Sequence, residues 1–117
     1  MRFFNTAKGE KEIFDPDRKD LGLYICGPTV YSDTHLGHAK SYVSFDVLKR
    51  WLQYRDYEIT HIQNFTDVSD ETAISSHKLG LNELEFTKKY EEEFLGKMKL
   101  LSNSPATKYT RASEYVE

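Results

Sequence analysis

Cysteine is almost absent from this sequence, and so are long hydrophobic runs and any large excess of one charge. A single cysteine excludes an intramolecular disulfide and fits a reducing, cytoplasmic location. The first residues lack the apolar segment of a signal peptide, and no stretch is apolar over a membrane-spanning length, so we expect no membrane partner. The chain has 16 basic and 19 acidic residues, which disfavours a surface that grips nucleic acid over its whole area.

What the sequence does contain is enough apolar residues for one packed domain. Hydrophobic residues make up 38% of its 117 positions and aromatic residues 14%, which is typical of a globular chain. We therefore interpret residues 1–117 as a single domain. Within residues 1–20, apolar pairs on either side of a polar turn at Lys8-Gly9 predict a hairpin.

Residues 21–66 have the pattern of a parallel βαβ unit. A short apolar run at 21–26 predicts a buried strand, and the alternation over 58–65 predicts a second one. Between them, residues 36–54 have helical periodicity, which predicts a crossover helix of right-handed connection. Its predicted core-facing residues step by four, with two leucines widening the face: Ala39, Val43, Val47, Trp51, Leu48 and Leu52.

Residues 69–101 predict two further helices. The first runs over 69–79 and ends at Gly80, a residue suited to a helix C-terminus. The second begins after Asn82 and has a predicted core-facing stripe at Tyr90, Phe94, Met98 and Leu101. The last dozen residues are weakly patterned. These elements predict an α/β fold that resembles the opening portion of a larger doubly wound sheet.

The loop from Cys26 to His38 is the strongest candidate for chemistry. It follows a predicted buried strand, and open α/β sheets bind ligands beyond the carboxyl ends of their strands. His35 and His38 straddle the start of the next helix, where backbone N–H groups and the helix dipole favour an anion. Gly37 between them lets a flat ring or a phosphate approach the backbone. The alternative is that both are ordinary loop histidines.

Several segments in this order resemble the N-terminal catalytic segment of cysteinyl-tRNA synthetases. The matching residues are Cys26 to Tyr31 (Cys-Gly-Pro-Thr-Val-Tyr), His35 to Ala39, Phe45 to Val47 and Asn64 to Val68. The resemblance implies a partial Rossmann-like nucleotide-binding domain of the HUP type, with a parallel βαβ core and additional C-terminal helices. It also implies ATP-dependent activation of cysteine to cysteinyl-adenylate and transfer to tRNA(Cys).

The same resemblance implies roles for individual residues. Cys26 would bind substrate cysteine through a zinc ion, because zinc favours thiolate ligands. Gly27 and Thr66 would line the cysteine pocket. The ATP-binding residues, with Mg²⁺ accompanying the nucleotide, would be Gly27, Thr29, His35, Gly37 and His38. Of these, His35 and His38 would be catalytic, stabilising the transition state at the α-phosphate.

Each of these residues has a simpler interpretation. Cys26 alone is more often a small buried apolar residue than a metal ligand. Thr66 and Asp67 could cap the helix that follows them, with or without a role in the pocket. His61 and His77 have no partners at ligand spacing, so we interpret them as structural or exposed.

The chain also departs from the family. The remaining zinc ligands, the second nucleotide-binding loop (Lys-Met-Ser-Lys-Ser) and the anticodon-binding region are absent from this sequence. Lys97-Met98-Lys99 has a similar composition, but we interpret it as helix surface with Met98 inward. Ser32 replaces a common Asp, and Glu71 replaces a common Lys, which weakens the expected contact with an anion. We therefore expect an incomplete site, inactive alone, whose partner is a missing C-terminal half.

Three functions fit these observations. The first is the catalytic fragment of a cysteine–tRNA ligase. The second is a ligase that joins cysteine to an amino sugar, as in mycothiol biosynthesis, although Thr29-Val30 in place of Thr-Pro disfavours it. The third is a stand-alone, non-catalytic relative that binds nucleotide.

Overall fold

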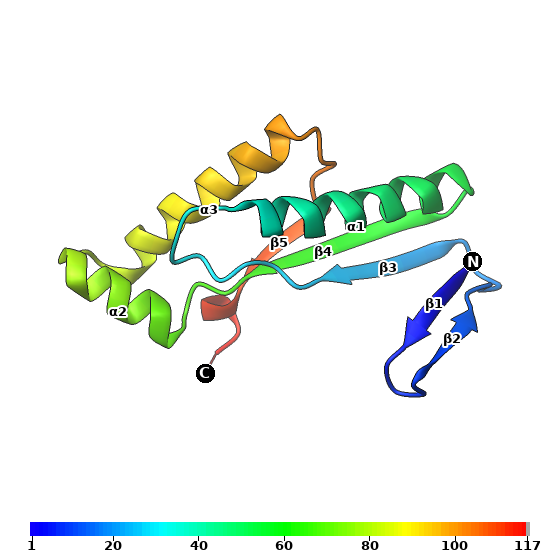
Figure 1. The fold of residues 1–117 in the computed structure, drawn as a ribbon, viewed down its shortest axis with the longest axis horizontal. Helices are drawn as coiled ribbons and strands as arrows, with labels where there is room; N and C mark the ends of the chain where they lie inside the picture. The colour runs from blue at the N-terminus through cyan, green and yellow to red at the C-terminus, as the bar shows by residue number, and fades with distance from the viewer. Residues whose placement is uncertain (117) are drawn as a thin grey trace.

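The computed structural model describes residues 1–116, which form two separate sheets and three α-helices. A hairpin comes first, with β1 (Arg2–Asn5) antiparallel to β2 (Glu10–Ile13). Gly9 adopts a φ of 71° in its turn, a conformation that glycine reaches without strain. Phe3 packs edge-to-face on Phe14 at 5.3 Å between ring centroids. The predicted hairpin is therefore confirmed, at one end of the molecule (Figure 1).

The main sheet is parallel, with strand order β3-β4-β5. Helix α1 (Leu36–Tyr54) connects β3 (Asp20–Ile25) to β4 (Glu58–Phe65), which confirms the predicted βαβ unit. Helices α2 (Asp70–Leu79) and α3 (Glu83–Leu100) precede β5 (Lys108–Arg111) and the 3₁₀-helix η1 (Ala112–Glu114). The carboxyl ends of all three strands therefore lie at one edge, close to the loop that leads into α1 (Figure 1).

Strand β5 lies in the segment that appeared unpatterned in the sequence. Its four residues pair in parallel with the end of β4, from Ile62 beside Lys108 to Phe65 beside Arg111. A short polar strand has no apolar alternation of its own, so it forms because an edge of β4 is available. The sequence analysis did not predict this strand, because it assigned no element after residue 101.

The core lies on the face of the sheet that α1 and α3 cover. Phe65 is fully buried, and its ring lies edge-on to Phe94 of α3 and stacked on Tyr109 of β5. Burying such a side chain stabilises the fold by about 1.5–3 kcal/mol. The remaining buried members of this cluster are Ile25, Val30, Tyr42 and Met98. The inward position predicted for Met98 is confirmed.

Helix α1 is rotated relative to the prediction from its sequence. Tyr42, Lys49 and Leu52 are its buried residues, whereas Val47 is 60% exposed and Trp51 40% exposed. The Tyr42 hydroxyl donates to the Cys26 carbonyl, and Lys49 Nζ donates to the Pro105 carbonyl. The long side chains of Tyr42 and Lys49 can reach the end of β3 and the loop between α3 and β5. They therefore face inward, and the smaller valines face outward.

Two further residues with predicted core positions are exposed. Val43 of α1 is 37% exposed, in line with the rotation of that helix. Leu101 is 47% exposed because it is the C-cap of α3, where the chain leaves the helix. Among residues 1–116, no helix combines the length and the apolar composition needed to cross a membrane.

Candidate functional site at the carboxyl edge of the sheet

Gly27 lies where the chain leaving β3 passes closest to β4. A β-carbon at this position would lie 1.4 Å from the carbonyl oxygen of Asn64 and 2.6 Å from its carbonyl carbon. Both atoms belong to the backbone of a central strand and cannot move aside as a flexible side chain can. Only glycine fits here, and its backbone therefore lies directly against the end of β4.

The side chain of Asn64 joins the ends of the two strands. Its Oδ1 accepts hydrogen bonds from the Gly27 backbone N–H at 2.9 Å and from the Tyr24 hydroxyl at 2.8 Å. Its Nδ2 donates to Thr66 Oγ1 at 3.3 Å. Asn64 therefore fixes Gly27 and Thr66 relative to each other. The sequence analysis included Asn64 in a motif but gave it no role.

Backbone pairing continues past the strands. Thr29 and Thr66 form an isolated parallel bridge, in which Thr66 N–H donates to the Pro28 carbonyl at 3.0 Å and Val30 N–H donates to Thr66 at 3.2 Å. Four predicted site residues are thus brought to one place: Cys26, Gly27, Thr29 and Thr66.

Cys26 is exposed, and its thiol is free. Its carbonyl accepts a hydrogen bond from the Tyr42 hydroxyl at 3.1 Å, and burial of Tyr42 raises the pKa of that phenol, which keeps it a donor. Because the thiol is exposed, the interpretation of Cys26 as a small buried apolar residue is wrong.

A complete metal site is not formed by the described residues. Within residues 1–116, no three His, Cys, Asp or Glu side chains are grouped so that they could hold a metal ion. Structural and catalytic zinc sites use three or four protein ligands. Cys26 by itself therefore does not fit a zinc ion, and any such site needs ligands from outside these residues.

The two histidines of the loop form the N-terminus of α1 together. His35 is the N-cap, and its Nδ1 accepts a hydrogen bond from the Gly37 N–H at 3.0 Å. His38 Nδ1 accepts from the His35 N–H at 3.3 Å, and the two rings stack with centroids 3.9 Å apart. A neutral imidazole that accepts at Nδ1 carries its proton on Nε2. Both rings therefore have Nε2–H groups available to a ligand.

Electrostatics at this helix start favour the neutral form of His38. Burial and the neighbouring His35 lower the pKa of His38 below its ordinary value. Gly37 keeps the rings in place, because a β-carbon there would lie 2.8 Å from Cε1 of the His35 ring. The first turn of α1 contains no acidic side chain, so an approaching anion meets no carboxylate of that turn.

Helix α3 holds the loop just before His35. Glu93 Oε1 accepts from the Thr34 N–H at 3.2 Å, and Lys97 Nζ donates to the Thr34 carbonyl at 3.4 Å. Glu93 and Lys97 also form an ion pair, and the Lys97 hydrogen bond lowers the pKa of Glu93. A hollow of about 290 Å³ lies beside His35, between this loop and α3.

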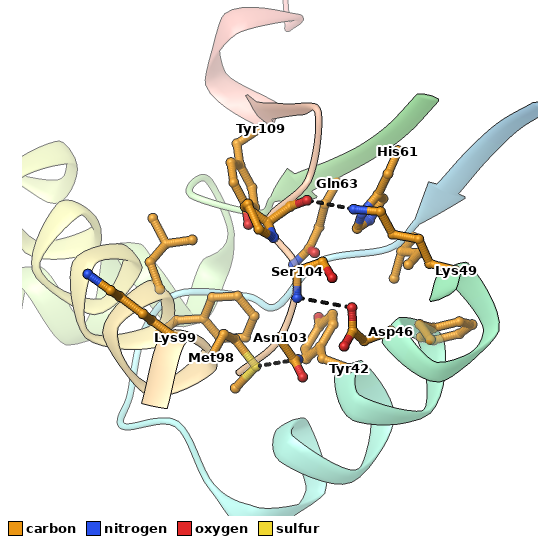
Figure 2. A pocket seen from close by; sticks show the side chains of 15 residues that line it. Tyr42, Asp46, Lys49, His61, Gln63, Met98, Lys99, Asn103, Ser104 and Tyr109 are labelled. Atoms are coloured by element: carbon orange, nitrogen blue, oxygen red, sulfur yellow. Dashed lines mark hydrogen bonds between the residues drawn. The ribbon is translucent and has the colours of Figure 1, made fainter. Parts of the chain in front are cut away.

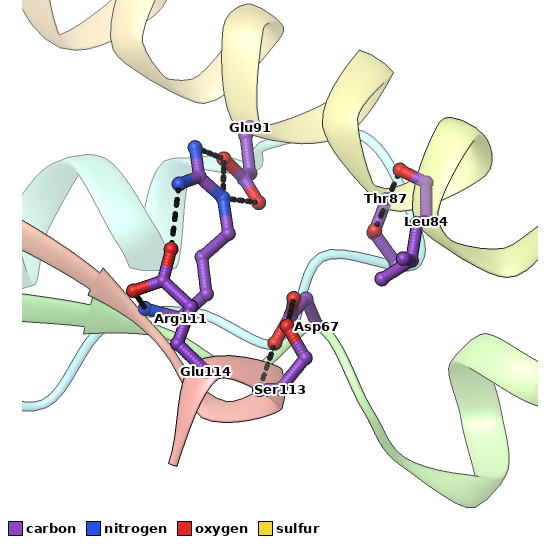
Figure 3. Close-up of polar contacts among 7 residues, drawn as sticks. All are labelled: Asp67, Leu84, Thr87, Glu91, Arg111, Ser113 and Glu114. Carbon is purple, nitrogen blue, oxygen red and sulfur yellow. Dashed lines mark hydrogen bonds and ion pairs between the residues drawn. The ribbon is translucent and has the colours of Figure 1, made fainter.

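Thr66 and Asp67 do not cap the helix that follows them. Ser69 is the N-cap of α2, and its side chain accepts from the Thr72 N–H. Asp67 is 1% exposed and accepts hydrogen bonds from the backbone N–H and the hydroxyl of Ser113, which attaches η1 to the end of β4 (Figure 3). The capping alternative is therefore wrong.

An ion pair between a buried carboxylate and a partly exposed arginine completes the attachment of β5. Glu91 of α3 is 3% exposed, and Arg111 donates to both of its carboxylate oxygens, with the shortest distance 2.7 Å (Figure 3). Sequence reasoning missed this pair because the two residues are twenty positions apart on elements of different type.

Other side chains of interest lie away from the edge or at its margin. Ser32 and Glu71 are exposed, and His77 is exposed as expected. At the start of α2, hydrogen bonds from its own backbone and from Ser69 lower the pKa of Glu71, so it is a fixed negative charge. His61 is buried within the sheet, 4% exposed.

Comparison with known proteins identifies relatives over the whole chain. Residues 13–117 match the family described as tRNA synthetases class I (C), catalytic domain. A cysteine–tRNA ligase of Thermococcus onnurineus is 40% identical over 100% of this chain and 25% of its own length. A chloroplastic/mitochondrial cysteine–tRNA ligase of Zea mays is 39% identical over 100% of this chain and 21% of its own length. The chain thus spans about a fifth to a quarter of the length of these relatives.

A solved structure supports the fold. The LeuRS of Agrobacterium radiobacter K84, in a ternary LeuRS–tRNA–LeuAMS complex, aligns with a TM-score of 0.69 and 20% sequence identity. The alignment covers 83% of this chain and 13% of that one, so the likeness concerns the fold alone. It agrees with a partial Rossmann-like α/β domain. On the match over residues 13–117, this chain belongs to the family of class I (C) tRNA synthetase catalytic domains.

Proposed function

We propose that this chain is the N-terminal catalytic part of a cysteine–tRNA ligase and contributes half of its nucleotide site. The observation that carries the proposal is the pair of stacked imidazoles at the start of α1. Both rings accept backbone hydrogen bonds at Nδ1 and are therefore left with Nε2–H donors for a phosphate. The names of the relatives supply the amino acid and the tRNA as expected substrates.

The proposed reaction is adenylate formation. A carboxylate oxygen of cysteine forms a bond to the α-phosphorus of ATP, and the bond between the α- and β-phosphates breaks to release pyrophosphate. His35 and His38 would donate hydrogen bonds to the phosphate oxygens on which charge builds up, and Gly37 would let the nucleotide approach. Such a step depends on positioning and charge stabilisation rather than on a protein nucleophile. Mg²⁺ would enter with ATP as part of the substrate.

The other edge residues would form the amino-acid side of the site. Gly27 and Thr66, held together by Asn64, would line the cysteine pocket, and Thr29 would lie between that pocket and the nucleotide. Zinc is the ligand that the resemblance implies at Cys26, but the described residues do not complete its coordination, so no step is assigned to it. We propose that the activated cysteine is then transferred to tRNA(Cys). A further part of the protein would supply the remaining zinc ligands and the second phosphate-binding loop. A cytoplasmic location stays a prediction.

The first test measures ATP binding to this chain by NMR. Millimolar ATP should shift the amide signals of Gly37 and His38, and replacement of His35 and His38 by alanine should abolish these shifts. His77→Ala on the exposed face of α2 is the matched control and should leave them unchanged. The absence of any shift at Gly37 and His38 would show that the proposed nucleotide site is not preformed.

The second test is cysteine-dependent pyrophosphate exchange. We expect exchange near background for this chain, because the proposal assigns half of the phosphate contacts to a further part of the protein. A zinc titration should likewise give weak binding, since Cys26 is a lone ligand. Robust exchange, or a tight equimolar zinc complex of the monomer, would contradict this division of the site.

A further inference from the structure

A second cavity lies between α1 and α3, over the face of the sheet (Figure 2). Its volume is about 420 Å³, within the range of pockets that hold small molecules. Most of its wall is apolar and comes from Ile25, Phe45, Phe94, Leu95 and Met98. The loop over residues 103–105 covers one side of it.

The floor of the cavity contains polar groups without partners. His61 is 4% exposed, and neither of its ring nitrogens has a hydrogen-bond partner among the described residues. Gln63, two positions along β4 and on the same face, is also 4% exposed, and its Nε2 has no partner either. Buried polar groups without partners destabilise a fold by about 1–3 kcal/mol each. Two of them, side by side on a cavity wall, indicate a ligand that bonds to both.

The cavity wall contains a buried lysine, Lys49, and one carboxylate, Asp46, which already has partners of its own. Lys49 is 6% exposed, and its Nζ donates to the Pro105 carbonyl at 2.7 Å, which leaves two of its three N–H donors free. Among residues 1–116, no carboxylate forms an ion pair with Lys49, because Asp46 pairs with Arg50 and accepts from the Ser104 N–H. Lys99 lies at the rim, where its exposed ammonium points away from His61 and Gln63 (Figure 2).

Burial determines which of these groups can donate. Burial and the nearby Lys49 lower the pKa of His61, so its ring is neutral near pH 7 and offers one N–H and one acceptor. Burial, despite the nearby Asp46, also lowers the pKa of Lys49, and a bound anion would offset that loss of solvation. Free donors outnumber free acceptors, so the complementary ligand group accepts hydrogen bonds and carries negative charge.

We propose that this cavity binds a small organic carboxylate with an apolar or aromatic body. Its carboxylate would accept from Lys49 Nζ, from Gln63 Nε2 and from His61, and its body would pack between Phe45 and Phe94. The proposal does not depend on the nucleotide site, which uses other residues. The two sites share one wall, because Tyr42 lines the cavity and its hydroxyl holds the Cys26 carbonyl.

Benzoate is a suitable probe, and benzyl alcohol, which has a ring of equal size but no charge, is its matched control. In NMR titrations of the 117-residue chain near pH 7, benzoate should give saturable shifts of the Gln63 side-chain amide and the His61 ring. The dissociation constant should be on the order of 1 mM, as expected for so few non-hydrogen atoms. Benzyl alcohol should bind about tenfold more weakly, because it cannot form charge-assisted hydrogen bonds.

Two variants locate the site. Lys49→Met keeps the apolar stem and removes the charge, and it should weaken benzoate about tenfold without changing benzyl alcohol. His61→Phe keeps a ring of similar shape but removes one hydrogen-bonding group, so it should weaken benzoate and leave benzyl alcohol almost unchanged. The proposal is overturned if benzoate causes no saturable shift at Gln63 up to about 20 mM, if both probes bind wild type equally, or if the shifts occur at Gly37 and His38 instead. ATP titration of the same variants separates this result from the proposed function, since neither substitution touches the loop histidines.

Discussion

Strand β4 contributes to two regions that treat their polar groups in opposite ways. At its carboxyl end, Asn64 has three hydrogen-bond partners, and the loop from Gly27 is tied to it by backbone and side chain. Three residues earlier, His61 is more deeply buried than the half-buried Asn64 but has no partner for either ring nitrogen. The first arrangement fixes geometry before any ligand arrives. The second leaves donors free in a cavity, which is what a binding pocket needs.

The comparison predicts that the carboxyl edge tolerates almost no change, and Gly27→Ala is its strongest test. The new β-carbon would collide with backbone atoms of Asn64, so the ends of β3 and β4 would have to separate. We expect a loss of more than about 3 kcal/mol in unfolding free energy, or failure to fold. Urea denaturation, monitored by circular dichroism, measures this loss.

Gly22→Ala, within β3 itself, is the matched control. A β-carbon at Gly22 would meet no atom within 4 Å, so this substitution should change stability by less than about 1 kcal/mol. Equal losses for the two variants would show that the close approach at Gly27 does not constrain the edge.

Arg111→Ala tests the ion pair that attaches β5 to α3. It leaves the carboxylate of Glu91 buried and unpaired, and we expect a loss of about 3 kcal/mol. Glu114→Ala removes the exposed partner of the same arginine and should cost less than about 1 kcal/mol. Thermal unfolding of both variants checks the contrast, which fails if Glu114→Ala is the more destabilising of the two.

Asn64→Ala tests the link between the strand ends. It removes three hydrogen bonds and leaves the Gly27 N–H without its partner, so we expect a loss of about 2 kcal/mol. Tyr24→Phe removes one of the three bonds at an exposed hydroxyl and should cost about 0.5 kcal/mol. The role assigned to Asn64 is wrong if the two variants unfold at the same urea concentration.

The change in unfolding free energy caused by His61→Phe should have the opposite sign, which would sharpen the contrast between the two regions. Replacing an unpartnered imidazole by an apolar ring of similar shape should stabilise the chain by about 1 kcal/mol near pH 7. His77→Phe, at an exposed position of α2, should have no such effect. A stability loss in His61→Phe would indicate that the cavity depends on the imidazole.

The same histidine predicts a pH dependence. Because burial holds the pKa of His61 below 6.5 in the folded chain, the unfolded chain takes up a proton first as the pH falls. The free energy of unfolding should therefore be highest above pH 6.5 and decrease as the pH falls from 6.5 towards the folded pKa. His61→Phe should flatten this decrease. His38 also has a lowered pKa, so adding His38→Gln to His61→Phe should flatten it further. An unchanged pH profile in His61→Phe would contradict the assignment.

Sequence patterns predicted the elements whose signals are local. Helix α2 ends at Gly80, which has a φ of 65°, and α3 begins after Asn82, as expected from their capping preferences, whereas the N-cap of α2 is Ser69 and not Thr66 or Asp67. The apolar run of β3 and the alternation of β4 were also sufficient to predict these two strands. In contrast, β5 has only four mostly polar residues, and no local rule distinguishes them from a loop.

The sequence predicted which residues belong to the candidate site, but it could not predict how their atoms are arranged. The histidine motif indicated a phosphate site, yet the sequence could not show that each imidazole accepts a backbone hydrogen bond and so exposes its Nε2–H. The predicted inward face of α1 was right for Leu52 but wrong for Val43, Val47 and Trp51, because steps of four drift around a helix of 3.6 residues per turn. The buried residues on that helix follow the contacts of Tyr42 and Lys49 instead.

By itself, the sequence determined the α/β class, the βαβ order and the start of α1 at Leu36, because turns and periodicity involve residues within a few positions of one another. The tertiary structure alone decided that Gly27 lies against Asn64, that β5 pairs with β4, and that His61 faces a cavity without a partner. Each of these depends on which distant segments pack together, and a local pattern contains no information about such contacts.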